Sequence, residues 1–132
     1  MSDNLARRLY WASSGGLDQE VLELLQRGVP PNSDYYTRVC DGETPLHWAC
    51  ADNHLRCAEL LIKFGAIVAA TANDGWTPLH KACYYNNKAT AKLLLEHHCP
   101  PDIEKSSSGG QTAADLARER GHRALADYLE GF

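Results

Sequence analysis

The chain lacks the features that mark a membrane protein or a nucleic-acid-binding protein. No apolar run approaches the ~20 residues that a membrane-spanning helix needs, and the start has no apolar stretch of the signal-peptide type. Basic residues are outnumbered by acidic ones, 13 to 17, which gives a net charge of −4 at pH 7. Surfaces that bind nucleic acid or anionic membranes normally show a basic excess. We therefore expect neither nucleic acid nor a membrane as a partner.

Cysteine pairs and phosphate-binding loops are also missing. The five cysteines form an odd number, and none belongs to a C-x-x-C pair, which argues against a disulfide framework. We expect a cytoplasmic or nuclear protein in which Cys50 and Cys83 act as small buried hydrophobes. The glycines at 109–110 are not followed by the Gly-Lys-Ser/Thr of a phosphate loop.

The most prominent feature of the sequence is a repeated four-residue motif, called here the repeated word. Thr-Pro-Leu-His occurs at 44–47 and again at 77–80, 33 residues apart, and the flanking residues continue in the same register. A fixed period of this size indicates stacked supersecondary units, each unable to bury its apolar face alone. Since 132 residues fit one domain, we expect a single short solenoid.

Each copy of the word predicts the start of a short helix. Thr44 and Thr77 stand where a helix N-cap belongs, and the proline that follows each of them falls at N1, where its missing N–H costs nothing. Asn53 and Asn86 occupy the next turn, where asparagine tolerates the left-handed conformation that ends a helix. A second apolar stripe of helical period follows each turn, so every unit is predicted to be a helix pair.

The two ends of the chain are degenerate copies of the same unit, as terminal units of a solenoid must be. We therefore predict one domain over 1–132, and its start at Met1 and polar end units favour a self-sufficient chain. Its predicted parts are an N-terminal repeat at about 4–38, full repeats at 39–70 and 71–104, and a C-terminal capping repeat at 105–132.

Two connections are longer than the regular one. Four extra residues fall within 33–41 and two within 103–109. Insertions in repeat proteins map to loops on one face, often the binding face. The first insertion contains Tyr35, Tyr36 and Arg38, a composition suited to contact with a partner.

These repeats resemble the ankyrin repeat family. Gly-x-Thr-Pro-Leu-His-x-Ala at 42–49 and 75–82 is similar to the family signature, and the match extends over about 4–130. The resemblance implies an all-α stack of about four helix-turn-helix units joined by finger-like β-turns. It also implies a concave surface, made of the fingers and the first helices, that binds partner proteins.

The histidines of the repeated word suggest either a catalytic base or a structural bridge. His47 and His80 each follow a capping threonine by three residues, and their repetition favours scaffolding of the helix start. A zinc site at His97, His98 and Cys99 is disfavoured, because a tetrahedral site needs about four ligands at suitable spacing. We expect no catalytic activity, no metal and no cofactor.

Aromatic residues at convergent positions indicate a contact surface. Large aromatic side chains are costly to leave in water and are enriched in binding hot spots. Trp76 follows the glycine of a predicted finger, and Tyr84 and Tyr85 end a first helix on the side that the resemblance makes concave. The alternative for Trp48 and Tyr84 is packing against an adjacent helix. The predicted partner-binding residues are Tyr35, Tyr36, Arg38, Glu43, Trp48, Asp52, Asn73, Asp74, Trp76, Lys81, Tyr84 and Tyr85.

The acidic and polar members of this set predict the charge of the partner. Glu43, Asp52, Asn73 and Asp74 would rim the aromatic surface, which favours a protein segment that carries lysine or arginine. We therefore expect a monomeric, non-catalytic protein-interaction module. The alternative is a structural fragment or substrate-adaptor part of a longer ankyrin protein whose effector region lies elsewhere.

Overall fold

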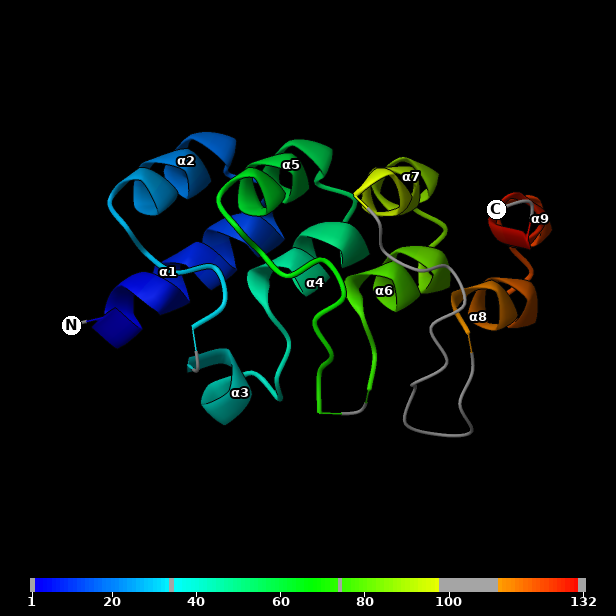
Figure 1. Ribbon diagram of the computed structural model, residues 1–132, viewed down its shortest axis with the longest axis horizontal. Coiled ribbons are helices and arrows are strands. Elements are labelled where there is room, and N and C mark those ends of the chain that lie inside the picture. The colour runs from blue at the N-terminus through cyan, green and yellow to red at the C-terminus, as the bar shows by residue number, and fades with distance from the viewer. Residues whose placement is uncertain (1, 34, 74, 98–111, 131–132) are drawn as a thin grey trace.

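The computed structural model is a stack of antiparallel helix pairs (Figure 1). It describes residues 2–33, 35–73, 75–97 and 112–130. Every regular element within these ranges is a helix, which confirms the all-α prediction. In chain order they are α1 (Ser2–Gly15), α2 (Asp18–Gln26), α3 (Tyr35–Val39), α4 (Pro45–Ala51), α5 (Leu55–Lys63), α6 (Pro78–Tyr84), α7 (Lys88–Glu96), α8 (Ala113–Glu119) and α9 (Arg123–Glu130).

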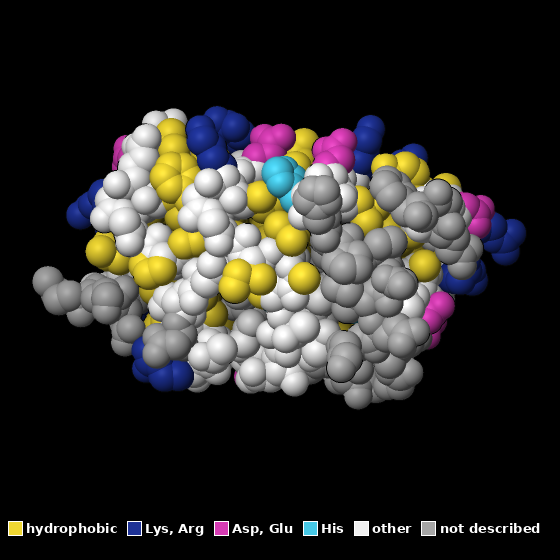
Figure 2. Space-filling model, in the orientation of Figure 1, with side chains coloured by type: hydrophobic (Ala, Val, Ile, Leu, Met, Phe, Trp, Pro, Cys, Tyr) yellow, Lys and Arg dark blue, Asp and Glu magenta, His cyan; other side chains and the backbone are white. Residues whose placement is uncertain are grey.

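The helices form two layers. The first helices α1, α4, α6 and α8 lie side by side in one layer, and the second helices α2, α5, α7 and α9 lie in the other (Figure 1). Each first helix packs against its own second helix and against the first helix of the next pair. One core runs through the stack and is formed by leucines and small residues. Among the small residues, Ala49, Cys50 and Cys83 are 0% exposed. On the face that Figure 2 shows, charged side chains gather along the margin of α2, α5 and α7.

The repeated word builds the helix starts in the predicted way. The Thr44 hydroxyl accepts the backbone N–H of His47, and the His47 ring nitrogen Nδ1 accepts the backbone N–H of Thr44 at 3.0 Å. The pair Thr77 and His80 repeats this geometry at 3.1 Å. Because Nδ1 of His47 is an acceptor, Nε2 carries the proton and donates to the Trp76 carbonyl at 2.8 Å. The structural interpretation of these histidines is therefore confirmed.

One repeated position joins each helix pair to the preceding one. The side chains of His54, Asn87 and His122 each contact a carbonyl in the last turn of the preceding first helix, at 3.0, 2.7 and 3.2 Å. The preceding residues Asn53 and Asn86 both have φ of 60°, as the sequence predicted. These contacts satisfy the carbonyls that a helix end leaves without an intrahelical partner.

The first insertion forms the short helix α3 rather than an exposed contact loop. Tyr36 is 1% exposed, and its hydroxyl donates to the Ala6 carbonyl of α1 at 3.3 Å. Tyr35 is 7% exposed and packs edge-on against Tyr36 at 5.6 Å. The expectation that this insertion presents both tyrosines to a partner needs correction, because α3 turns them toward α1, where burying aromatic area stabilises the fold. Arg38, on the same helix, is exposed.

The described helices are also short relative to a bilayer. Among the residues that the structure describes, none forms a helix with both the length and the apolar character needed to span a membrane.

Candidate functional site: an aromatic row on the first helices

A continuous series of ring contacts crosses the layer of first helices. It begins on α1, passes over α4 and ends where α6 ends. One member is a lysine, whose ammonium group links two tryptophans. We call this series the aromatic row; its members are Tyr10, Trp11, Trp48, Trp76, Lys81, Tyr84 and Tyr85.

The first part of the aromatic row is centred on Tyr10. Its ring meets Trp11 edge-on at 5.4 Å, Trp48 at 6.0 Å and the buried Tyr36 at 6.4 Å. Trp11 is 62% exposed, a high value for a tryptophan. Burial raises the pKa of the Tyr10 phenol above its ordinary value, and the nearby Cys40 and Glu43 add to the effect. The raised pKa keeps the Tyr10 phenol in its neutral form.

The middle of the row holds a lysine between two indoles. The ammonium nitrogen of Lys81 lies 5.3 Å from the Trp48 ring centre and 5.4 Å from that of Trp76. It also pairs with the Glu43 carboxylate at 2.9 Å, and the two side chains are only 13% and 14% exposed. We expected Glu43 to offer its charge to a partner. That expectation needs correction, because Lys81 from the next helix pair already neutralises it.

The last part of the row ends in an exposed tyrosine. The ring centres of Trp76 and Tyr84 are 5.3 Å apart, and those of Tyr84 and Tyr85 are 5.0 Å apart. The Tyr85 side chain is 51% exposed. Trp76 is half-buried and stacks on His80 at 6.0 Å, so it packs back onto α6. The expectation that Trp76 presents its ring to a partner from a finger therefore needs correction, since the ring packs against the chain itself. The guanidinium group of Arg120, the residue after α8, lies 4.4 Å from the ring centre of Tyr84.

The alternative packing role holds for the half-buried members of the row. Trp48 contacts Tyr10 of α1 and Lys81 of α6, and Tyr84 contacts Arg120 just after α8, so both pack against neighbouring helix pairs. This packing leaves Trp11 and Tyr85, at opposite ends of the row, as its strongly exposed aromatic members.

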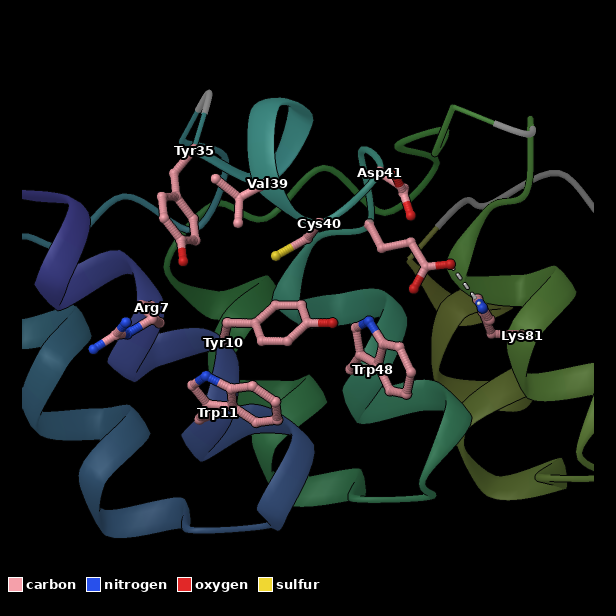
Figure 3. A pocket seen from close by; sticks show the side chains of 10 residues that line it. Arg7, Tyr10, Trp11, Tyr35, Val39, Cys40, Asp41, Trp48 and Lys81 are labelled. Carbon is pink, nitrogen blue, oxygen red and sulfur yellow. Dashed lines mark ion pairs between the residues drawn. The ribbon is translucent and has the colours of Figure 1, made fainter.

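An open groove of about 630 Å³ lies along the first part of the row, between α1, α3 and α4 (Figure 3). The Tyr10 ring lies across its centre, and the Trp48 indole nitrogen points toward the Tyr10 hydroxyl (Figure 3). Arg7 stands at one end and Asp41 at the other. The lining residues are Arg7, Tyr10, Trp11, Tyr35, Val39, Cys40, Asp41, Glu43, Trp48 and Lys81.

The sequence-based prediction missed Tyr10 and Trp11, although a signal for Trp11 is present. Trp48 and Lys81 occupy the same position in successive units, 33 residues apart. When the four inserted residues are added to the period, the equivalent position in the first unit lies 33 + 4 = 37 residues before Trp48, which is Trp11. The first unit lacks the Thr-Pro-Leu-His word that would have fixed this register.

Other predicted site residues lie away from the groove. Asp52 is exposed and accepts a hydrogen bond from Ser14 at 3.2 Å, and Asn73 is exposed on a finger. The backbone N–H of Asn73 donates to the Asp41 carbonyl at 2.8 Å, which joins two neighbouring fingers. Asp74 lies outside the described residues.

The thiols and histidines of the described chain do not assemble into a reactive centre. Cys40 and Cys57 are free thiols, and Cys50 and Cys83 are buried in the core. Burial raises the pKa of Cys40 above its ordinary value and thereby favours the unreactive thiol form. No group of three potential metal ligands occurs within the described ranges. Of the three residues considered for zinc, His97 is exposed just after α7, and His98 and Cys99 lie outside the described residues.

Comparison with known proteins agrees with this architecture. The family profile described as "Ankyrin repeats (3 copies)" matches residues 9–107 and 71–130. No curated protein matches the chain. Proteins of the matched family generally serve as protein–protein interaction modules and are typically non-catalytic. The profile covers most of the sequence and the structure shows the stacked helix pairs that it implies, so the chain belongs to the ankyrin repeat family.

Proposed function

We propose that the protein is a non-catalytic module that binds a partner protein along the aromatic row. The observation that carries this proposal is the exposure of Trp11 and Tyr85, 62% and 51%, at the two ends of one connected series of rings. Exposed aromatic side chains are costly in water and are over-represented in the energetic centres of protein interfaces. The two ends lie on α1 and at the end of α6, so an extended partner segment that contacts both would cross α4.

The interior of the row supports this role by holding the surface rigid. Trp48, Trp76 and Lys81 fix one another through two cation–π contacts, and Glu43 anchors the lysine. A surface whose rotamers are already fixed loses little conformational entropy on binding. The row therefore provides a preformed site.

The same proposal includes the setting in which the module acts. We place it in the cytosol or the nucleus as a monomer, and the free thiols of Cys40 and Cys57 support a reducing compartment.

Affinity capture from a cell lysate tests the proposed site. The wild-type protein is compared with a Trp11→Ala/Tyr85→Ala variant, and a Leu17→Ala/Ile67→Ala variant serves as the control. Leu17 and Ile67 are 54% and 57% exposed and lie off the row, so the control removes apolar side chains of similar fractional exposure. Circular dichroism establishes that all three proteins fold.

We expect the row variant to lose proteins that the wild type and the control both retain. Retention of the same proteins by all three chains, in equal amounts, would remove the aromatic row as the binding site.

A further inference from the structure

The contacts of Lys81 show that the aromatic row can bind a cation. Its ammonium group lies between the faces of Trp48 and Trp76 and against the Glu43 carboxylate, with the side chain 13% exposed. Aromatic rings attract cations through their electron-rich faces, most strongly for tryptophan, and a carboxylate adds a charge-assisted hydrogen bond. The chain thus supplies its own cationic ligand to this half of the row.

The groove beside α1 repeats this combination at a second carboxylate, that of Asp41, beside the Lys81–Glu43 pair on its wall. Tyr10, Trp11 and Trp48 supply the aromatic surfaces, and Asp41 lines the same space. Asp41 is exposed, and no lysine or arginine of the described chain forms an ion pair with it. Trp11 also occupies the same repeat position as Trp48 and Lys81, so the row continues into the groove with an indole in place of an ammonium group.

We infer that this groove binds a lysine or arginine side chain presented by the partner protein. The inference rests on the proposed function and deepens it by specifying the chemistry of the anchor residue. The methylene stem of the partner side chain packs on Tyr10 and Trp11, and its charged end lies between Trp48 and Asp41. Long basic side chains suit such a place, because their stems bury apolar area while the charged end keeps polar partners.

The other charges of the groove are compatible with this occupant. Lys81 and Glu43 neutralise each other at 2.9 Å, so they leave little net charge on the groove wall. Arg7 stands at the end opposite Asp41, and its guanidinium group points away from the other lining side chains (Figure 3). The carboxylate end of the groove therefore favours a cation.

An uncharged apolar anchor is the competing occupant. Val39 is 57% exposed and lines the same groove, where it could pack against a leucine or methionine side chain of a partner as well as against the stem of a basic one. The two occupants differ in charge at the Asp41 end, so a probe of matched shape and different charge separates them.

The test uses n-butylammonium chloride, which reproduces the end of a lysine side chain, and 1-butanol as its neutral counterpart. Binding to the intact protein is followed through the three indole N–H resonances in ¹⁵N NMR spectra, with potassium chloride matching the ionic strength. Single Trp→Phe variants assign the resonances. We expect butylammonium to shift the Trp11 and Trp48 resonances saturably, because both indoles line the groove, and to leave that of Trp76, which is not among the lining residues, unchanged.

Butylammonium is expected to bind about fivefold more tightly than butanol, given typical cation–π and ion-pair contributions. Asp41→Asn should remove most of this preference, whereas Asp127→Asn, an exposed carboxylate on α9, should leave it intact. Equal binding of the two probes, or no saturable shift with either, would overturn the inference.

These outcomes are separable from those of the capture experiment. Proteins lost from the Trp11→Ala/Tyr85→Ala variant while butylammonium fails to bind would support the proposed function and contradict a cationic anchor. Butylammonium binding that depends on Asp41, with no capture difference, would support the cation site and contradict the proposed function.

Discussion

Replacing Lys81 by methionine should destabilise the fold, because this lysine links two helix pairs through contacts with three side chains. Its ammonium group contacts the rings of Trp48 and Trp76 and pairs with Glu43 at 2.9 Å. Methionine keeps most of the volume and removes the charge, so the substitution isolates the electrostatic part of the contact.

The magnitude follows from the burial of the pair. Each cation–π contact contributes about 0.5–1 kcal/mol, and removing one member of a fully buried ion pair costs about 3–5 kcal/mol. Because the Lys81 and Glu43 side chains retain 13% and 14% exposure, the ion-pair cost is discounted, and we expect Lys81→Met to lower the free energy of unfolding by about 2–4 kcal/mol. Combining it with Glu43→Gln should reveal a coupling energy of about 1–2 kcal/mol.

Urea unfolding followed by far-UV circular dichroism measures these values, since the helix backbone dominates that signal. The control is the pair of Arg56 and Glu59, 3.7 Å apart on one helix with side chains 62% and 43% exposed. Its coupling should stay below about 0.5 kcal/mol. If the coupling of Glu43 with Lys81 is no larger than that of the control pair, the account of the middle of the row is wrong.

Three further predictions concern single positions. Ser13 is 0% exposed and its hydroxyl has no partner among the described residues, so Ser13→Ala should raise the unfolding free energy by about 1–2 kcal/mol, and a loss of stability in urea would contradict this. Gly42 and Gly28 both have positive φ, 80° and 91°, so an alanine at either position strains the backbone. A Cβ added at Gly42 would also lie 2.9 Å from a backbone nitrogen of the next finger, whereas one added at Gly28 would enter open space. Gly42→Ala should therefore lower the stability of the fold more than Gly28→Ala does. Equal thermal melting shifts for the two alanine variants would refute that ranking. Burial, with a hydrogen bond to Asp18, raises the pKa of Cys57 to about 12 from its ordinary value of 9.0. The folded state therefore holds this proton more tightly than the unfolded state, so the stability of the wild type relative to Cys57→Ala should fall between pH 9 and about pH 12, and a constant difference over that range would exclude it.

The repeated elements could be predicted from the sequence because neighbouring residues determine each of them. Thr44 and His47 are three residues apart, so their reciprocal hydrogen bonds depend on one helix turn alone. The left-handed turns at Asn53 and Asn86 likewise need only a residue type that tolerates positive φ. Local chemistry of this kind is visible in a single sequence.

Contacts between helix pairs were harder to predict from the sequence. Glu43 and Lys81 meet only because adjacent units stack, so their charges were interpreted as available to a partner although they neutralise each other. Tyr35 and Tyr36 follow no repeat pattern, and their burial depends on how α3 packs against α1. Trp11 was obscured by the insertion that shifts the first unit out of register. The site is therefore determined by tertiary packing that the period alone does not specify.

Site-specific photo-crosslinking in cells tests most directly whether the aromatic row is the binding surface. p-Benzoylphenylalanine is introduced in place of Trp11 or Tyr85, and in place of Leu17 or Ile67 at comparably exposed positions off the row. The account predicts protein adducts from positions 11 and 85 and few from 17 and 67. Adducts that form mainly from positions 17 and 67 would contradict it.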